Sequence, residues 1–273
     1  MKKQLYLYVL LLAIIVIAMV KVKEHMTEHK EDAIRDLPQI KEQGVLRLAA
    51  DYNSVELHAS ADSMAGFQYE LAKEFSNFLG VEVEIYPIGD IQESLKGLEN
   101  NEFDIVARLI PVTTSLKNDY AVSTPFITSK HVLVQRKVKD AADDSTFIRN
   151  QLRLAGKELY IPANSSVATR ISNLMKEIGD TIYVKQHEIY QDEQLIQMVA
   201  AGLIDYAVVD EHIAKKMIAN YPDLDIETDI SFSQLNSWIT RKESIELIDS
   251  INSFIDKFKT TDKFKSLQKR YLK

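Results

Sequence analysis

The sequence contains no cysteine in 273 residues, and only eight of its residues are glycine. The missing cysteine excludes disulfide scaffolds, thiolate metal sites, cysteine nucleophiles and lipidation of an N-terminal cysteine. The glycines form neither GxGxxG nor GxxxxGKS/T, so the usual loops that cradle nucleotide phosphates are missing. A formal net charge of −7 provides no basic field to attract nucleic acid. We therefore expect neither a cofactor nor a nucleic-acid partner.

The overall composition is that of a globular protein. Hydrophobic residues make up 46% of the chain, charged residues 27% and aromatic residues 8%, which excludes disorder of the chain as a whole. The length allows one large domain, or two lobes of roughly 100 to 120 residues each.

One long apolar run lies at the N-terminus. Residues 5–20 are uninterrupted apolar residues, with two lysines on each flank. Sixteen residues fall between the core of a signal peptide and the roughly 17 to 25 residues of a membrane helix. Because no small-x-small cleavage site follows, we favour an uncleaved anchor. Residues 1–22 are thus interpreted as a signal anchor or signal peptide, with the rest of the chain periplasmic and held at the inner membrane by residues 5–20.

The polar segment over residues 23–40 is interpreted as a linker. It contains His25 and His29, which share a helical face and have glutamates beside them. Their order is not HExxH, and two histidines in a charged linker are usually solvated, so we expect no metal site there.

The body of the chain carries the same order of strand and helix patterns twice. In the first copy, strand, helix, strand, helix and strand patterns fall at 45–50, 67–80, 81–86, a segment opened by Asp90, and 103–110. In the second copy, the same patterns fall at 158–162, 166–178, 181–186, 193–201 and 205–210. A β-α-β-α-β order implies parallel strands joined by right-handed crossovers. The sequence therefore predicts an α/β fold with two similar lobes.

Two apolar, strand-like runs at 129–136 and 232–239 are candidates for the crossings between the lobes. They predict a two-strand hinge, with helices over 244–259 and 262–272 packing back on the first lobe. We place the first lobe at 41–133 and 234–273, and the second at 134–233.

The residues that end matched strands are the first candidates for a site, because ligands gather at the carboxyl ends of parallel strands. Arg108 ends the third strand of the first lobe, and Asp210 ends its counterpart. A guanidinium on one wall and a carboxylate on the other complement a small zwitterionic ligand. The offsets from the two strand starts differ by one residue, so one side chain could face away, and Arg108 fits a salt bridge equally well. Asp51 and Asn53 follow the first strand, where either a cleft or a turn role is open.

A family resemblance rests on six segments: DLPQIKEQGVLRLAADYN (36–53), GFQYELAKEFSNFLGVEVE (66–84), FDIVARLIPVTTS (103–115), LYIPANSSVATRISNLMKEIG (159–179), LIQMVAAGLIDYAVVDEHIA (195–214) and NSWITRK (236–242). In these segments the chain resembles the type II periplasmic solute-binding proteins of the amino-acid class, family 3. It is most similar to the substrate-binding-like domain of membrane-bound lytic murein transglycosylase F.

The resemblance implies a two-lobed binding fold whose hinge closes on a small ligand. It also implies that Asp210 receives a ligand ammonium, and that Ser165, Ser166 and Thr113 help bind a carboxylate. Two positions depart from the family. Leu116 stands where amino-acid binders usually have an arginine, and Leu57 stands where an aromatic residue is common. Arg108 could replace the lost guanidinium.

The predicted function is an extracytoplasmic protein that closes on an amino acid, short peptide or peptidoglycan-derived ligand, for a membrane transporter or envelope enzyme. We expect no enzymatic activity, because transglycosylase F continues into a lysozyme-like domain after a tyrosine similar to Tyr271, whereas this sequence stops at Lys273. The alternatives are a transglycosylase-related protein that lacks its catalytic domain, and an envelope scaffold that binds no ligand.

Overall fold

The computed structural model describes residues 34–61, 63–138 and 146–273. Residues 36–273 form one compact unit, to which the following description applies. The predicted anchor at 5–20 and most of the predicted linker lie outside the described residues. Within the described part of the chain, no helix has both the length and the apolar character needed to cross a membrane.

The first lobe is built on a five-stranded sheet in the order β4-β1-β5-β14-β6. β1 pairs in parallel with β4 and β5, while β14 pairs antiparallel with β5 and β6. The bounds are β1 (Val45–Ala50), β4 (Glu82–Pro87), β5 (Ile105–Val106), β6 (Tyr120–Val122) and β14 (Ile239–Arg241). A short antiparallel pair, β2 (His58–Ser60) and β3 (Ser63–Ala65), precedes the second helix of this lobe.

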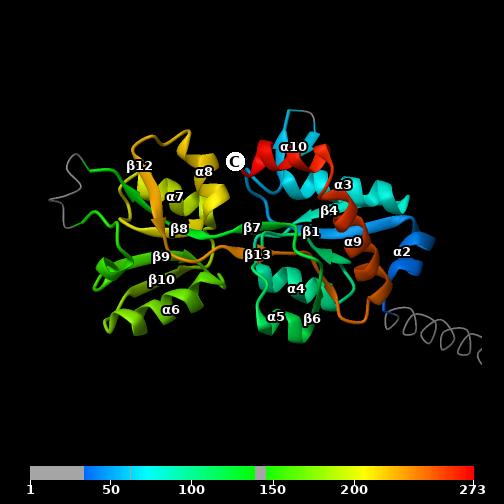
Figure 1. Ribbon diagram of the computed structural model, residues 1–273, viewed down its shortest axis with the longest axis horizontal. Coiled ribbons are helices and arrows are strands. Elements are labelled where there is room, and N and C mark those ends of the chain that lie inside the picture. The colour runs from blue at the N-terminus through cyan, green and yellow to red at the C-terminus, as the bar shows by residue number, and fades with distance from the viewer. Residues whose placement is uncertain (1–33, 62, 139–145) are drawn as a thin grey trace, which may run out of the picture. The chain divides into compact units, whose positions relative to one another are not determined.

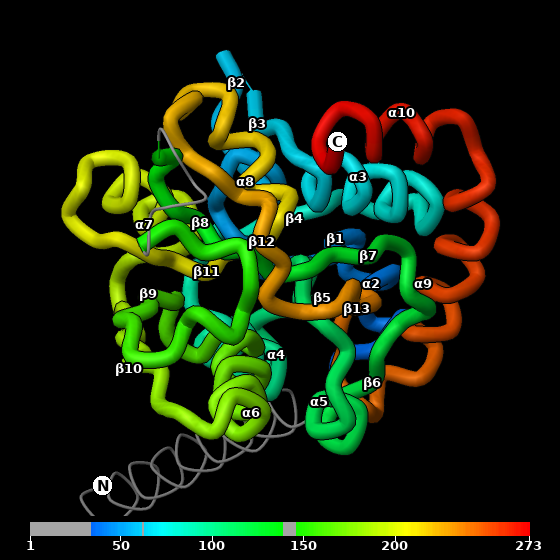
Figure 2. Tube along the Cα trace, turned by 60° about the vertical axis from the view of Figure 1, so that its left-hand side comes forward, coloured from blue at the N-terminus to red at the C-terminus, as the bar shows by residue number. Residues whose placement is uncertain are grey.

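Six helices belong to the first lobe: α2 (Leu37–Gln43), α3 (Phe67–Leu79), α4 (Ile91–Glu99), α5 (Thr114–Asp119), α9 (Ile245–Phe258) and α10 (Asp262–Tyr271). The helix α3 shows why the sequence forms them. Phe67, Leu71 and Phe75 recur at helical spacing and are buried, and Gly80 ends the helix with φ 74°. As predicted, α9 and α10 return to the first lobe, where α10 lies beside α3 (Figure 2).

The second lobe repeats this plan. Its five-stranded sheet has the order β10-β9-β11-β8-β12, in which β9 pairs in parallel with β10 and β11. In both lobes, the first strand of the β-α-β-α-β pattern thus lies between the other two strands of that pattern. The bounds are β8 (His131–Arg136), β9 (Glu158–Pro162), β10 (Tyr183–His187), β11 (Ala207–Asp210) and β12 (Leu224–Asp229). The helices are η1 (Gln151–Leu154), α6 (Val167–Ile178), α7 (Asp192–Ala200) and α8 (Glu211–Ile218).

Two short strands cross between the sheets. β7 (Ile127–Ser129) and β13 (Gln234–Asn236) pair antiparallel, and Figure 1 shows this pair between the two sheets. The two-strand connection was predicted, but the first crossing was placed too late in the chain. Residues 131–136, predicted as part of the crossing, form β8 inside the second sheet. β7 and β8 are both apolar extended runs, so the sequence pattern alone does not tell the crossing strand from the sheet strand that follows it. The exact lobe boundaries stay predictions.

The third strand of the first lobe is much shorter than predicted. The sequence predicted a strand over 103–110, whereas β5 covers only Ile105–Val106. The backbone N–H of Ala107 still donates to the carbonyl of Ala49 at 2.8 Å. Beyond it, the Arg108 guanidinium bonds the carbonyls of Ile88 and Gly89, which follow β4. The pairing of this segment in the sheet therefore ends just before Arg108, whose side chain bonds the segment after β4.

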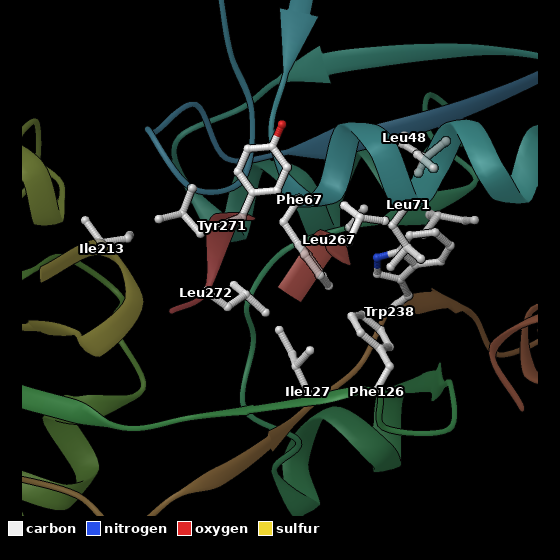
Figure 3. Close-up of a cluster of buried hydrophobic side chains, with 14 of the residues drawn as sticks. Leu48, Phe67, Leu71, Phe126, Ile127, Ile213, Trp238, Leu267, Tyr271 and Leu272 are labelled. Carbon is white, nitrogen blue, oxygen red and sulfur yellow. The ribbon is translucent and has the colours of Figure 1, made fainter. Parts of the chain in front are cut away.

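An aromatic core of the first lobe lies next to the crossing strands (Figure 3). Trp238 is fully buried, and its ring lies 5.9 Å from that of Phe126 and 5.8 Å from that of Phe75. The same apolar cluster continues through Ile127 of β7 and Leu272 to Ile213 of α8. The crossing strands and the second lobe thus share packing with the first.

Candidate functional site

A cavity of about 400 Å³ lies between the two sheets. We call it the interlobe cavity. Its walls come from the segments after β1 and β5 in the first lobe, and from the ends of β9 and β11 and the starts of α6 and α7 in the second. Its volume is in the range of small-molecule sites in proteins, roughly 300 to 1,000 Å³.

Six of the seven predicted site residues line this cavity: Asp51, Arg108, Thr113, Ser165, Ser166 and Asp210. The uncertainty about strand parity is thus resolved geometrically, because Arg108 and Asp210 both face the same space. Asn53 differs from the others: it is buried and, in the described part of the chain, is not among the lining residues. What each of these residues does for a ligand stays a prediction.

The Arg108 guanidinium is held by its own lobe. It donates to the carbonyl oxygens of Ile88 at 2.8 Å and Gly89 at 2.9 Å, and its Nη2 lies 3.2 Å from Oδ2 of Asp51. The residue is only 9% exposed. Two carbonyl bonds fix the direction of the planar group, and Asp51 balances its charge.

A buried glutamate, Glu56, lies beside this ion pair. Its Oε2 accepts from the backbone N–H of Leu109 at 2.8 Å, and its Oε1 accepts from Asn53 Nδ2 at 3.2 Å. The same Asn53 amide donates to Asp51 at 3.2 Å. Burial and the charge of Asp51 raise the pKa of Glu56 to about 8, against the opposing effects of Arg108, the Leu109 N–H and Asn53. Glu56 therefore carries a proton at neutral pH in this environment.

The second lobe presents a matching pair of carboxyl groups. Asp210 caps α8, its Oδ1 accepting from the backbone N–H of His212 at 2.8 Å. The backbone N–H of Asp210 donates to Oδ2 of Asp192, the first residue of α7, at 3.1 Å. Burial raises the pKa of Asp192 to about 8, and the negative charges of Asp210 and Asp51 add to the shift. Like Glu56, Asp192 holds a proton at neutral pH.

A histidine completes this wall. His131 lies opposite Asp210 in the antiparallel pairing of β8 with β11, and it is 9% exposed. Its Nδ1 lies 3.4 Å from the hydroxyl of Ser231. Burial lowers the pKa of His131, although the charge of Asp210 opposes this. The ring is thus a neutral polar group near the acids.

Hydroxyl groups occupy the remaining predicted positions. The Thr113 hydroxyl caps α5 by accepting from the N–H of Leu116 at 3.2 Å. Ser166 stands at the N-cap of α6 without a side-chain capping bond, while the Ser165 hydroxyl lies 3.4 Å from the N–H of Val167. The start of α6 is the positive end of its helix dipole, which suits an anionic group of a ligand.

Two hydrogen bonds join the lobes at this level. The backbone N–H of Ser54 donates to Oε1 of Glu193 at 2.7 Å, and Asn164 Nδ2 donates to Oδ2 of Asp90 at 3.1 Å. Each bond has one partner from either lobe, so the described conformation is one in which the lobes touch across the cavity.

Sequence reasoning missed Glu56, Asp192 and His131. Glu56 does interrupt an apolar stretch, Val55-Glu56-Leu57, in which both neighbours are fully or almost fully buried. A charged residue between two buried apolar residues indicates a buried ionisable group, but the sequence pattern does not say which groups surround that side chain. Asp192 stands just before the helix predicted over 193–201, and its position in the cavity wall emerges only from the packing of α7 against β11. In the described residues, no group of three or more His, Asp or Glu side chains is placed to hold a metal ion.

Comparison with known proteins places this geometry in context. The family model for bacterial extracellular solute-binding proteins, family 3, matches residues 46–273. The membrane-bound lytic murein transglycosylase F of Aeromonas salmonicida is 30% identical over 210 residues, which are 76% of this chain and 40% of that protein. The chain spans about half the length, or less, of the curated relatives it matches.

Solved structures share the fold. The amino acid ABC transporter substrate-binding protein AbpA from Streptococcus pneumoniae, solved bound to L-arginine, aligns with a TM-score of 0.73 and 23% identity over 85% of this chain and 96% of that chain. The ancestral amino acid-binding protein AncCDT-1 aligns with a TM-score of 0.74 and 20% identity over 87% and 99%. The α/β fold with two lobes predicted from the sequence is therefore confirmed, as is the family resemblance.

Proposed function

The chain belongs to the bacterial extracellular solute-binding proteins, family 3, and from that premise we propose that it binds an amino acid, short peptide or peptidoglycan-derived fragment in the interlobe cavity. The observation that carries the proposal is the convergence of polar groups from both lobes on one cavity. Arg108, Asp51 and Thr113 line it from one side, and Asp210 with the start of α6 from the other.

The two lobes offer complementary chemistry to a ligand that has both charges. The carboxylate of Asp210 would accept hydrogen bonds from a ligand ammonium. Ser165, Ser166 and the first N–H groups of α6 would donate to a ligand carboxylate, with Thr113 on the facing wall. These roles agree with those implied by the family resemblance.

Binding would proceed by closure about the β7 and β13 pair. Only these two short strands cross between the sheets among the described elements, so a small change in their backbone angles can move one lobe against the other. Closure excludes water, which strengthens each charged contact inside. The Ser54–Glu193 and Asn164–Asp90 bonds would then hold the closed form.

We further propose that the protein acts outside the cytoplasm, held at the inner membrane by residues 5–20, and passes or reports its ligand to a membrane transporter or envelope enzyme. We assign it no catalytic step. A second candidate is a part in peptidoglycan cleavage, favoured by the similarity to transglycosylase F. A peptidoglycan-clearing assay with the full chain separates the two, since turnover by this chain would overturn the binding-only assignment.

Calorimetric screening of the full chain in mild detergent, against amino acids and muropeptides, tests the proposal. We expect saturable binding that is weakened at least tenfold by Asp210→Asn, because a hydrogen bond to a charged group contributes about 1.5–3 kcal/mol. Asparagine caps helices as well as aspartate does, so α8 should stay intact. Asp223→Asn, an exposed aspartate of the same lobe, is the control. No binding by any compound would remove the proposal.

A further inference from the structure

His212 joins three parts of the chain away from the interlobe cavity. It lies on α8 of the second lobe and is 8% exposed. Its Nδ1 lies 2.8 Å from the carbonyl oxygen of Leu272, which follows α10 of the first lobe. Its Nε2 lies 3.0 Å from the carbonyl oxygen of Thr128 in the crossing strand β7. One side chain of the second lobe thus contacts both the first lobe and a strand that crosses between the lobes.

Both partners of the His212 ring can only accept a hydrogen bond. A peptide carbonyl oxygen has no hydrogen to donate, so each of the two contacts needs an N–H on the ring. Neutral histidine carries one ring N–H, whereas the imidazolium carries two. The two contacts are therefore satisfied together only when His212 is protonated. In the neutral ring, one nitrogen lone pair would face a carbonyl lone pair at hydrogen-bond distance.

The surroundings of the Leu272 contact make a missing proton costly. Leu272 is buried beside Ile213 in an apolar cluster that both lobes share. A buried carbonyl oxygen that loses its donor cannot readily take a water molecule in its place. The neutral ring therefore leaves an unsatisfied polar group in this conformation, and separation of the lobes would relieve it.

We propose that His212 is a pH-sensitive latch between the two lobes. Its imidazolium form bonds Leu272 and Thr128 together and holds α8 against the first lobe. Its neutral form keeps one of the two bonds and favours the open conformation. The inference goes beyond the proposed function, because the latch responds to pH without any ligand.

The sign of the response follows from the proton count. At this site the closed form binds more protons than the open form, so the closed fraction falls as pH rises. Histidine is the side chain whose charge ordinarily changes between pH 5 and pH 8. The latch therefore acts across the range in which the surroundings of an extracytoplasmic protein vary.

Other ionisable groups lie on the elements around His212, and a test has to separate their effects from those of its ring. Lys215 of α8 pairs with Glu211 at 2.6 Å. Lys130, which follows β7, pairs with Asp229 of β12 at 2.8 Å. The ionisable residues outside these two pairs, on the elements that pack against α8 or lie around Leu272, are Asp210, Lys216, Asp192, Glu193, His131, Arg136, Asp225, Glu227, Arg270, Tyr271, Lys273 and, with its ring 6.2 Å from that of Tyr271, His58.

Two acids in the cavity wall titrate close to the same pH range. Burial raises the pKa of Asp192 and of Glu56 to about 8. Their ionisation near pH 8 adds negative charge between the lobes, which also disfavours closure. A variant that changes His212 alone separates the latch from these two groups.

Energy transfer between dyes on the two lobes measures closure without a ligand. The full chain in mild detergent carries the dyes at Lys96→Cys on α4 and Lys176→Cys on α6, since the sequence has no cysteine of its own. We expect the ratio of closed to open forms to be about fivefold higher at pH 5.5 than at pH 7.5, as for one hydrogen bond gained. His212→Gln, whose amide does not titrate, should lose most of this change and keep only the part due to Glu56 and Asp192.

His187→Gln is the matched control. The Nδ1 of His187 accepts from the backbone N–H of Tyr190 at 3.2 Å, so its ring is engaged within the second lobe. This variant should keep the native pH response. Nitrogen NMR of the chain labelled in its histidine rings gives a second measurement, in which the signals missing from His212→Gln should show two protonated nitrogens at pH 5.5.

Three outcomes would overturn the inference. They are a neutral His212 ring at pH 5.5, an equal pH response in the native chain and His212→Gln, and energy transfer in the native chain that does not change with pH. The last needs no substitution at His212, so it decides the question even where His212→Gln fails to fold. Because these measurements involve no ligand, the proposed function stands or falls separately.

Discussion

Trp238 shows how one side chain ties the core of the first lobe to its crossing strands. It is fully buried, and its Nε1 donates to Oε1 of Gln68 at 2.8 Å. Trp238→Phe removes this donor and leaves the Gln68 oxygen without it in the core, so we expect a loss of about 1–3 kcal/mol in unfolding free energy beyond that of the cavity created. Urea denaturation measures it. In a double-mutant cycle with Gln68→Leu, the two losses should be less than additive, and strict additivity would contradict the assigned bond.

Glu56 and Asp192 predict an unusual pH dependence of stability. Their reference pKa values are 4.5 and 3.8, and in the folded protein both rise to about 8. Between these limits the folded state binds more protons than the unfolded state, so unfolding releases protons and stability falls as pH rises. We expect a decline on the order of a few kcal/mol in unfolding free energy from pH 5 to pH 8. Urea unfolding of the Glu56→Gln, Asp192→Asn double variant should show a shallower decline, and an unchanged slope would argue against both shifts.

At the scale of elements, the start of α3 packs against the backbone of Glu56, a residue that lines the cavity. Gly66 has φ 131°, and a Cβ there would lie 2.2 Å from the carbonyl oxygen of Glu56. Gly66→Ala therefore has to displace the backbone that carries the Glu56 carboxyl group. Gly80→Ala, at the other end of α3, is a matched control because Gly80 also has positive φ but open space around its Cβ position. The control should cost about 1–2 kcal/mol, and Gly66→Ala clearly more.

Hydrogen exchange can locate the disturbance that Gly66→Ala causes. The N–H of Gln68 donates to the Glu56 carbonyl at 3.0 Å, and the N–H of Leu109 donates to the Glu56 side chain at 2.8 Å. Both amides should exchange faster in Gly66→Ala and at the native rate in Gly80→Ala. Equal protection in the two variants would mean that Glu56 is not positioned through Gly66.

The elements also show how far the sequence could predict this site. Periodicity located β1 and β9 to the residue, because apolar runs bounded by turns leave few alternatives. It overestimated β5, because the backbone N–H of Leu109 bonds the side chain of Glu56 and not a neighbouring strand. Six lining residues were predicted from strand ends and family likeness. Glu56 and Asp192 were not, since their importance arises from long-range burial and from carboxyl neighbours that no local pattern encodes.

At the scale of the whole molecule, α8 connects the site to the rest of the chain. Its N-cap is Asp210, whose side chain accepts a hydrogen bond from the N–H of His212. The two ring nitrogens of His212 lie 2.8 Å from the Leu272 carbonyl oxygen and 3.0 Å from that of Thr128. A cavity residue is therefore two positions from contacts with both the crossing strand β7 and the end of α10. When the second lobe moves, the contacts of His212 with Thr128 and Leu272 must either break or move with it.

Opening of the cavity should depend on the bond between Ser54 and Glu193. Glu193→Ala removes an acceptor at 2.7 Å that joins the lobes without lining the cavity. One hydrogen bond contributes about 1 kcal/mol, so we expect the balance of open and closed forms to shift about fivefold toward open. Because the protein has no cysteine, Lys96→Cys on α4 and Lys176→Cys on α6 give two specific positions for fluorescent dyes. Energy transfer between them should change in Glu193→Ala and not in Glu188→Ala, an exposed glutamate of the same lobe. Equal transfer in both variants would mean that this bond does not hold the lobes together.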